Sequence, residues 1–97
     1  TRSVAIEMAA EQVRCNAVLL GAVDTPMLRD GFARRQHPDG ADGNRRDLIE
    51  KTPLQKIASP QEVAPAVRFF ADSTLSGFVT GQCLLVDGGV SVKLASE

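Results

Sequence analysis

The sequence predicts an α/β fold in which two parallel strands are joined by a helix. Two short apolar runs, 13–20 and 82–86, lack the alternation of half-exposed strands, as expected of parallel strands covered on both faces. A strong helix start lies between them at Ser59. The resulting order of helix, strand, helical loop, helix and strand is typical of one part of a doubly wound parallel sheet.

The first twelve residues predict a helix with two apolar stripes. One stripe consists of Val4, Ala5, Met8 and Ala9, and the other of Ile6 and Ala10. Glu7 and Glu11 mark the solvent side. Two stripes on one short helix indicate that it is covered twice, by the sheet and by another helix or a second subunit.

The first strand is followed by a glycine turn and a helix start. Gly21 ends the apolar run of residues 13–20, and Asp24 or Thr25 can cap a helix that begins at Pro26. Ligands in open α/β sheets bind at the carboxyl ends of strands. This turn is therefore the candidate binding site.

A charged segment between Met27 and Thr52 predicts a helix over 27–36, a loop over 37–43 and a second short helix after Asn44. One interpretation is a solvated surface with local ion pairs, each of little energetic value. The other is a mobile lid, because long polar insertions beside a ligand-binding turn often carry function.

The helix before the second strand has the clearest start. Ser59, Pro60 and Glu62 form a capping-box pattern, and the helix should run to about Ala71. The residues expected on its buried face are Val63, Val67 and Phe70, with Phe69 widening that face. Pro65 should kink or loosen the helix, because it removes one backbone hydrogen bond.

The second strand, 82–86, is stopped by Asp87-Gly88-Gly89, and no strong signal follows it. Cys15 and Cys83 lie within the predicted strands, so we expect reduced, buried packing residues. The single histidine, His37, stands in a polar loop without cysteine partners, so we expect no metal site.

Composition limits the class of protein. Ninety-seven residues, 43% of them hydrophobic, suffice for one small domain at most. Eleven Lys and Arg against twelve Asp and Glu give no basic excess that would indicate a nucleic-acid partner. With no membrane-length apolar run and no leader, we expect a soluble cytoplasmic protein that binds no membrane.

Four short motifs together resemble the closing half of the short-chain dehydrogenases/reductases. The first comprises Val13, Asn16, Val18, Gly21, Val23, Thr25 and Met27. In order after it come Thr52-Pro53-Leu54 with Lys56, then Ser59-Pro60-Gln61-Glu62-Val63-Ala64, and then Phe78-Val79-Thr80-Gly81-Gln82 leading into Val86-Asp87-Gly88-Gly89. The resemblance implies that 1–97 is the carboxyl-terminal portion of a single Rossmann-type NAD(P)-binding domain. Within it, 27–52 would be a variable substrate-loop insertion.

The resemblance also implies hydride transfer between NAD or NADP and a small alcohol or carbonyl substrate. The cofactor-binding residues it implies are Leu20, Gly21, Val23 and Thr25, and the substrate-binding residues are Met27, Leu28 and Phe32. Gly21 would let the backbone approach, and Thr25 would bond the carboxamide or a phosphate oxygen. Leu20 departs from the family, which usually has proline there.

The sequence lacks the family's Gly-rich phosphate turn, and its catalytic Tyr-x-x-x-Lys cannot exist because the chain contains no tyrosine. No catalytic residue carries over, so we expect the chain alone to be inactive and to need further strands from a longer chain or a partner. In the complete protein we expect a homo-oligomer, a dimer or tetramer. Two other interpretations are open: a non-catalytic interaction module, and an inactive remnant of a dehydrogenase.

Overall fold

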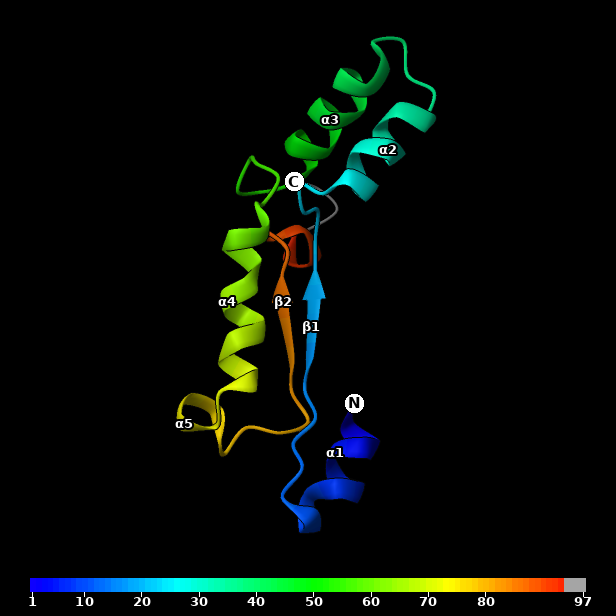
Figure 1. The fold of residues 1–97 in the computed structure, drawn as a ribbon. Helices are drawn as coiled ribbons and strands as arrows, with labels where there is room; N and C mark the ends of the chain where they lie inside the picture. The colour runs from blue at the N-terminus through cyan, green and yellow to red at the C-terminus, as the bar shows by residue number, and fades with distance from the viewer. Residues whose placement is uncertain (94–97) are drawn as a thin grey trace.

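The computed structural model describes residues 1–93 and consists of two strands, several helices and the turns that join them (Figure 1). In chain order the elements are α1 (Arg2–Met8), the 3-10 helix η1 (Ala9–Glu11), β1 (Ala17–Leu20), α2 (Pro26–Arg34), α3 (Gly40–Lys51), α4 (Pro60–Ala71), α5 (Ser73–Ser76), β2 (Cys83–Val86) and the 3-10 helix η2 (Val90–Val92).

The two strands form a parallel pair, which confirms the α/β prediction. Ala17 pairs with Cys83 at one end, and Leu20 pairs with Val86 at the other. Helix α4 lies in the crossover between the strands and packs against both of them (Figure 1). The parallel pair with its crossover helix is the frame on which the candidate site is built.

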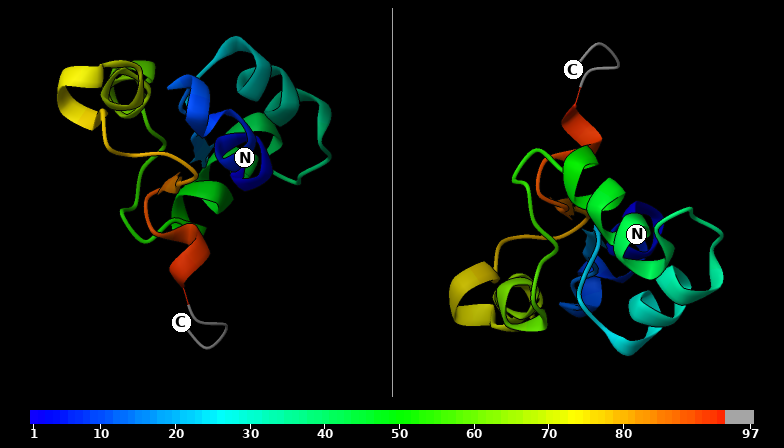
Figure 2. Two further views of the ribbon diagram at one scale, coloured as in Figure 1. Left: turned by 90° about the horizontal axis from the view of Figure 1, so that it is seen from below. Right: turned by 90° about the horizontal axis from the view of Figure 1, so that it is seen from above.

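The described chain is extended rather than closed around a core. Its extents are 55 × 31 × 22 Å and its radius of gyration is 16.9 Å, against about 13 Å for a compact domain of this length. Helices α2 and α3 lie beyond the carboxyl ends of the strands, and α1 lies beyond the other end (Figure 1). Figure 2 views the chain from the two ends and shows α4 and α5 on one side of the strands and α2 and α3 on the other.

The strands are only partly covered, which corrects the expectation of strands buried on both faces. Leu19 and Leu20 of β1 are 45% and 49% exposed, and Leu84 and Leu85 of β2 are 40% and 45% exposed. The accessible surface is 7193 Å², whereas a compact protein of this mass exposes about 5,400 Å². The strand sequences are therefore those of a larger sheet than residues 1–93 form.

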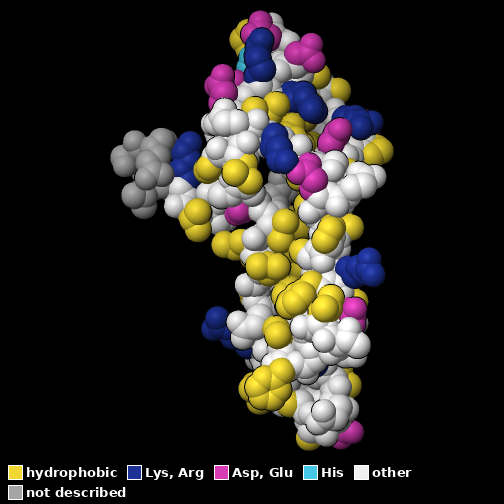
Figure 3. All heavy atoms as spheres, turned by 90° about the vertical axis from the view of Figure 1, so that its left-hand side faces the viewer, with side chains coloured by type: hydrophobic (Ala, Val, Ile, Leu, Met, Phe, Trp, Pro, Cys, Tyr) yellow, Lys and Arg dark blue, Asp and Glu magenta, His cyan; other side chains and the backbone are white. Residues whose placement is uncertain are grey.

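Helices α1 and α4 show the same incomplete cover. In α1 only Ala5 is buried, beside Gly81, while Ile6 is 80% exposed, so residues 1–93 cover only a small part of the predicted stripes. In α4 Val63 is buried as predicted, but Val67, which was expected on the same buried face, is 54% exposed. Figure 3 shows hydrophobic side chains gathered on the α4 side of the molecule.

Helix α4 begins as the capping box predicts, because the Glu62 carboxylate accepts the Ser59 N–H at 3.0 Å. It runs without interruption through Pro65. Pro65 is exposed, so water can solvate the Gln61 carbonyl, which lacks the hydrogen bond that an N–H at position 65 would have donated. The predicted kink therefore does not break the helix.

Some element boundaries differ from the predictions, and two short helices are additional to them. Helix α3 begins at Gly40 instead of after Asn44, because a turn in which the Gly40 N–H donates to the His37 carbonyl leads into it. Strand β1 begins at Ala17, because Cys15 and the residues beside it bond to an irregular segment. The short helices α5 and η2 were not predicted.

Both cysteines are free thiols. Cys83 is exposed, which corrects the expectation of a buried packing residue, because residues 1–93 leave that part of β2 uncovered. In this part of the chain no helix is both long enough and apolar enough to cross a membrane.

Candidate functional site

The turn after β1 is anchored on one side along its length. The Gly21 N–H donates to the Val86 carbonyl at 3.0 Å. Further on, the Ala58 N–H donates to the Ala22 carbonyl at 3.1 Å, and the Asp24 N–H donates to the Ala58 carbonyl at 2.8 Å. These bonds form an isolated parallel bridge between Val23 and Ala58, so the extended path of β1 continues past the end of the sheet.

The backbone of Val23 is left free by this arrangement. In a parallel ladder successive residues direct their N–H and C=O groups to opposite sides. Ala22 and Asp24 bond toward Ala58, so the polar groups of Val23 point to the other side, and they make no hydrogen bond within residues 1–93. An adjacent donor and acceptor on an extended backbone are what an amide group of a ligand requires.

Gly21 is required by packing against the end of β2. A Cβ built there would lie 2.8 Å from the Asp87 Cα and 2.9 Å from its Cβ, closer than real side chains approach. Since the contact includes backbone, a larger residue would displace the turn from β2. The structure thus gives Gly21 a structural reason that is independent of any ligand.

Thr25 caps helix α2 as predicted. Its hydroxyl accepts the Leu28 N–H at 3.3 Å, and Pro26 occupies the first helical position. The Thr25 side chain is half-buried, and it stands at the positive end of the helix dipole. A hydroxyl in this position can serve a ligand while it also caps the helix.

Asp24, the other predicted cap, instead binds Arg29. The guanidinium donates to both carboxylate oxygens, Nε to Oδ1 at 2.9 Å and Nη2 to Oδ2 at 3.2 Å. This hydrogen-bonded pair lowers the pKa of Asp24 and raises the pKa of Arg29. The fork joins the first turn of α2 to the candidate binding turn.

The linker after α3 docks on the turn after β2. The Leu54 N–H donates to the Gly88 carbonyl at 3.1 Å, and Thr52 is buried. Gly88 has φ +65°, and a Cβ there would lie 2.7 Å from the Thr52 Cγ2. Three of the sequence motifs therefore meet at the carboxyl ends of the two strands.

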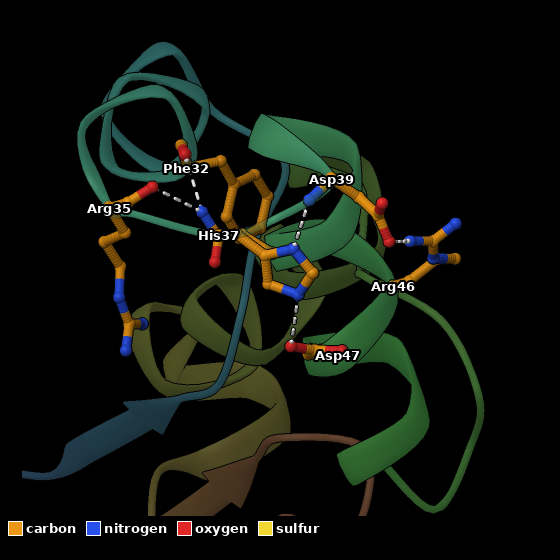
Figure 4. A network of polar contacts seen from close by, with 7 residues as sticks. Phe32, Arg35, His37, Asp39, Arg46 and Asp47 are labelled. Atoms are coloured by element: carbon orange, nitrogen blue, oxygen red, sulfur yellow. Dashed lines mark hydrogen bonds and ion pairs between the residues drawn. The ribbon is translucent and has the colours of Figure 1, made fainter.

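The predicted substrate residues occupy different environments on α2. Met27 is 84% exposed and Leu28 is half-buried, so both are available for contact beside the turn. Phe32 is only 6% exposed, and its ring points toward α3 (Figure 4). Residues 1–93 thus already cover Phe32, which serves the packing of α2 against α3.

A polar network that the sequence did not reveal joins α2 to α3 (Figure 4). The His37 Nδ1 accepts the Asp39 N–H at 2.9 Å, and its Nε2 lies 3.0 Å from the Asp47 Oδ2. An N–H donor at Nδ1 fixes the neutral ring as the tautomer with hydrogen on Nε2. The Asn44 amide donates to the carbonyls of Phe32 and Arg35, at 2.8 and 3.0 Å.

The network makes 26–51 a helical hairpin with its own internal bonds. Its one sequence signal is Gly43, since a glycine inside a helix indicates close approach of another group. A Cβ at Gly43 would lie 2.1 Å from the His37 Nδ1. Within the described residues no three potential ligands gather closely enough to hold a metal ion.

Comparison with known proteins gives one consistent group of matches. A family model described as enoyl-(acyl carrier protein) reductase matches residues 1–91. The L-rhamnose 1-dehydrogenase (NAD(P)(+)) of a Sphingomonas species is 37% identical over 94 residues, which are 96% of this chain and 34% of that protein. The 4-formylbenzenesulfonate dehydrogenase of Comamonas testosteroni is 38% identical over 92 residues, 95% of this chain and 34% of that protein.

Solved structures agree with these matches. A short chain dehydrogenase family protein from Francisella tularensis superposes with a TM-score of 0.88 at 33% identity, covering 96% of this chain and 39% of that one. The ligand-free aldohexose dehydrogenase of Thermoplasma acidophilum gives a TM-score of 0.85 at 37% identity, covering 98% of this chain and 37% of that one. The chain spans about a third of the length of the curated relatives it matches.

Proposed function

The chain belongs to the short-chain dehydrogenase/reductase family, and from that membership we propose hydride transfer between NAD or NADP and an alcohol or carbonyl substrate in the complete protein. Its fold is part of the doubly wound Rossmann-type sheet. In this proposal 1–97 is the carboxyl-terminal portion of one nucleotide-binding domain, and 27–52 is its substrate-binding insertion.

The free backbone of Val23 is the observation that carries the proposal. It lies at the carboxyl end of a parallel strand, where cofactors of α/β enzymes bind, and it faces away from Ala58 and β2. It could pair with the carboxamide of a nicotinamide ring. Thr25 would add a hydroxyl from the start of α2, and Gly21 and Leu20 would set the approach of the chain.

The substrate would lie between this turn and helix α2. Met27 and Leu28 offer apolar surface there, whereas Phe32 would reach a substrate only if α2 and α3 moved apart. The relatives include a sugar dehydrogenase and a 7alpha-hydroxysteroid dehydrogenase from Paraclostridium sordellii, so the family membership supports a small alcohol or carbonyl compound without naming one.

The groups that move protons must come from outside this chain. The sequence contains no tyrosine, so the phenol that serves the resembling enzymes has to be supplied by the rest of the complete protein. This chain would bind and orient the reactants and exclude water from them. Homo-oligomer formation belongs to the same proposal, because the exposed apolar surfaces of α1 and α4 require cover.

The exposed apolar side chains of α4, of α5 and of the loop after α5 also favour a second candidate function, a non-catalytic module that binds a protein partner. Val67 and Leu75 are 54% and 62% exposed, and the side chain of Phe78 is wholly exposed. Strong self-association of the complete protein without nicotinamide binding would favour the module. Nicotinamide-dependent oxidation of any alcohol would favour the dehydrogenase.

Substitution of Thr25 tests the proposed cofactor site in the complete protein. Thr25→Ala should weaken binding of the reduced nicotinamide about fivefold, the effect of one hydrogen bond of about 1 kcal/mol. Because the same change removes a helix cap at a cost of about 1 kcal/mol, cap loss needs its own control. Thr25→Ser should retain both functions.

The control variant is Asp72→Ala, which removes the cap of another helix. The Asp72 carboxylate accepts the Thr74 N–H at 2.9 Å at the start of α5, remote from the turn. This variant should lose stability and keep its nicotinamide affinity, as measured by fluorescence titration. An unchanged affinity in folded Thr25→Ala protein would remove Thr25 from the site.

A further inference from the structure

A cavity of about 180 Å³ lies behind the candidate cofactor turn, beside the start of α4. Its aliphatic wall includes Ala22 and Ala58, the two residues whose backbones bond to each other at the turn, together with Val63 and Val86. The volume corresponds to about six water molecules at about 30 Å³ each, so it suits a ligand of roughly five to eight heavy atoms.

The polar part of the lining carries an excess of negative charge. It contains one ammonium group, that of Lys56, and two carboxylates, those of Glu62 and Asp87. Lys56 is already paired with Glu62. The amino end of α4 adds about half a positive charge, which leaves the surroundings of the cavity negative.

Both carboxylates are ionised at neutral pH. Hydrogen bonding from Lys56 and from the Ser59 backbone lowers the pKa of Glu62, and hydrogen bonding from Ser91 and Gly89 lowers the pKa of Asp87. Each carboxylate oxygen accepts one of these bonds, and a carboxylate offers about four acceptor positions in all. Unused acceptors at the edge of an aliphatic wall would suit a donor that carries a positive charge.

We propose that this cavity is a second small-molecule site, which binds a short aliphatic primary ammonium compound. The ammonium group donates to the carboxylates of Glu62 and Asp87, and the hydrocarbon part packs against Val63 and Val86. A ligand held there also contacts Ala22 and Ala58, so it stabilises the backbone that carries the cofactor turn. Binding of the ammonium compound does not require that the protein transfers hydride, so this proposal can fail or hold separately from the proposed function.

Three straight-chain probes of four carbon atoms each test the proposal: butylammonium, 1-butanol and butyrate. Each is titrated into the complete protein by calorimetry and by NMR of the Val63 and Val86 methyl groups. Butylammonium should bind about tenfold more tightly than the alcohol, because charge-assisted hydrogen bonds are roughly twice as strong as neutral ones. Butyrate should bind more weakly than either probe.

Glu62→Gln is the decisive variant, because glutamine also completes a capping box and so preserves the start of α4. It should reduce butylammonium affinity about tenfold and leave 1-butanol affinity unchanged. Glu50→Gln, the same charge change on α3 outside the cavity lining, should alter neither.

Equal affinities for the three probes, or no binding of butylammonium at 100 mM, would overturn the proposal; the probe concentration here is about a hundredfold above a millimolar dissociation constant. Val63→Leu adds a further check by narrowing the cavity. It should weaken both butylammonium and 1-butanol. Unchanged binding in that variant would show that the probes bind elsewhere, and the cavity would then be a packing defect only.

Discussion

Gly43→Ala is expected to destabilise helix α3, against the usual effect of replacing a glycine within a helix. Alanine normally stabilises a helix interior by about 1 kcal/mol. At this position the new Cβ would lie 2.1 Å from the His37 Nδ1 and 2.2 Å from its Cε1. The imidazole ring would therefore have to leave its place.

The displaced ring gives up two hydrogen bonds, one from the Asp39 N–H and one to Asp47. At about 1 kcal/mol each they are worth about 2 kcal/mol, which exceeds the helix-propensity gain by about 1 kcal/mol. In a His37→Ala background neither bond exists and the space is clear. Gly43→Ala should then stabilise α3 by about 1 kcal/mol, so the two substitutions are coupled by about 2 kcal/mol.

Hydrogen exchange of the α3 amides is the appropriate assay, because it reports the opening of this hairpin separately from global unfolding. Gly43→Ala alone should speed exchange about fivefold, and in the His37→Ala background it should slow exchange about fivefold. Slower exchange in both backgrounds would refute the argument. It would show that the ring moves aside without cost and that the network does not hold α2 to α3.

Three further predictions follow from the same structure. In the complete protein Gly21→Ala should lower the free energy of unfolding by about 1–3 kcal/mol through overpacking against Asp87, as measured in urea, whereas Gly31→Ala, with nothing within 4 Å, should raise it by about 0.5–1 kcal/mol. Hydrogen bonds from Thr74 lower the pKa of Asp72 in the folded protein. The ionised Asp72 carboxylate therefore stabilises the fold above about pH 4, the pKa of Asp in the unfolded chain, and this stabilisation is lost as the pH falls through the lower pKa of the folded state. Asp72→Asn keeps the cap and should reduce the fall in the free energy of unfolding at acid pH. An unchanged fall would show that Asp72 does not contribute to the acid sensitivity. Arg29→Lys replaces the two-pronged bond to Asp24 with a single contact and should raise KM for the substrate more than it changes nicotinamide affinity, while equal effects on both would contradict a role in placing α2.

Local sequence signals predicted the elements that depend on local physics. Ser59 and Glu62 began α4 as expected, Thr25 capped α2, and the two apolar runs formed the parallel pair. Helix α3 was predicted to begin too late, because it starts from a turn in which the Gly40 N–H donates to the His37 carbonyl, and the apolar periodicity of the sequence does not mark that turn. Gly21 and Thr25 were predicted as site residues from the order of strand, turn and helix, and their binding role stays a prediction, whereas the free backbone of Val23 became visible only once Ala58 was placed beside it.

The strands show why coverage is harder to predict than conformation. A strand sequence that is apolar without alternation is typical of a strand buried on both faces in a complete sheet. Within residues 1–93, however, Leu19, Leu20 and Leu84 are each at least 40% exposed. The apolar surface of β1 and the free polar groups of Val23 lie at the same end of the frame. Further strands paired along the free edge of β1, together with the helices that connect them, would cover the apolar faces and at the same time close the far wall of the proposed nicotinamide site. If nicotinamide binds at the proposed site, completion of the core and completion of the site are a single structural event, so a chain that gains nicotinamide affinity should also lose the exposure of Leu19 and Leu20.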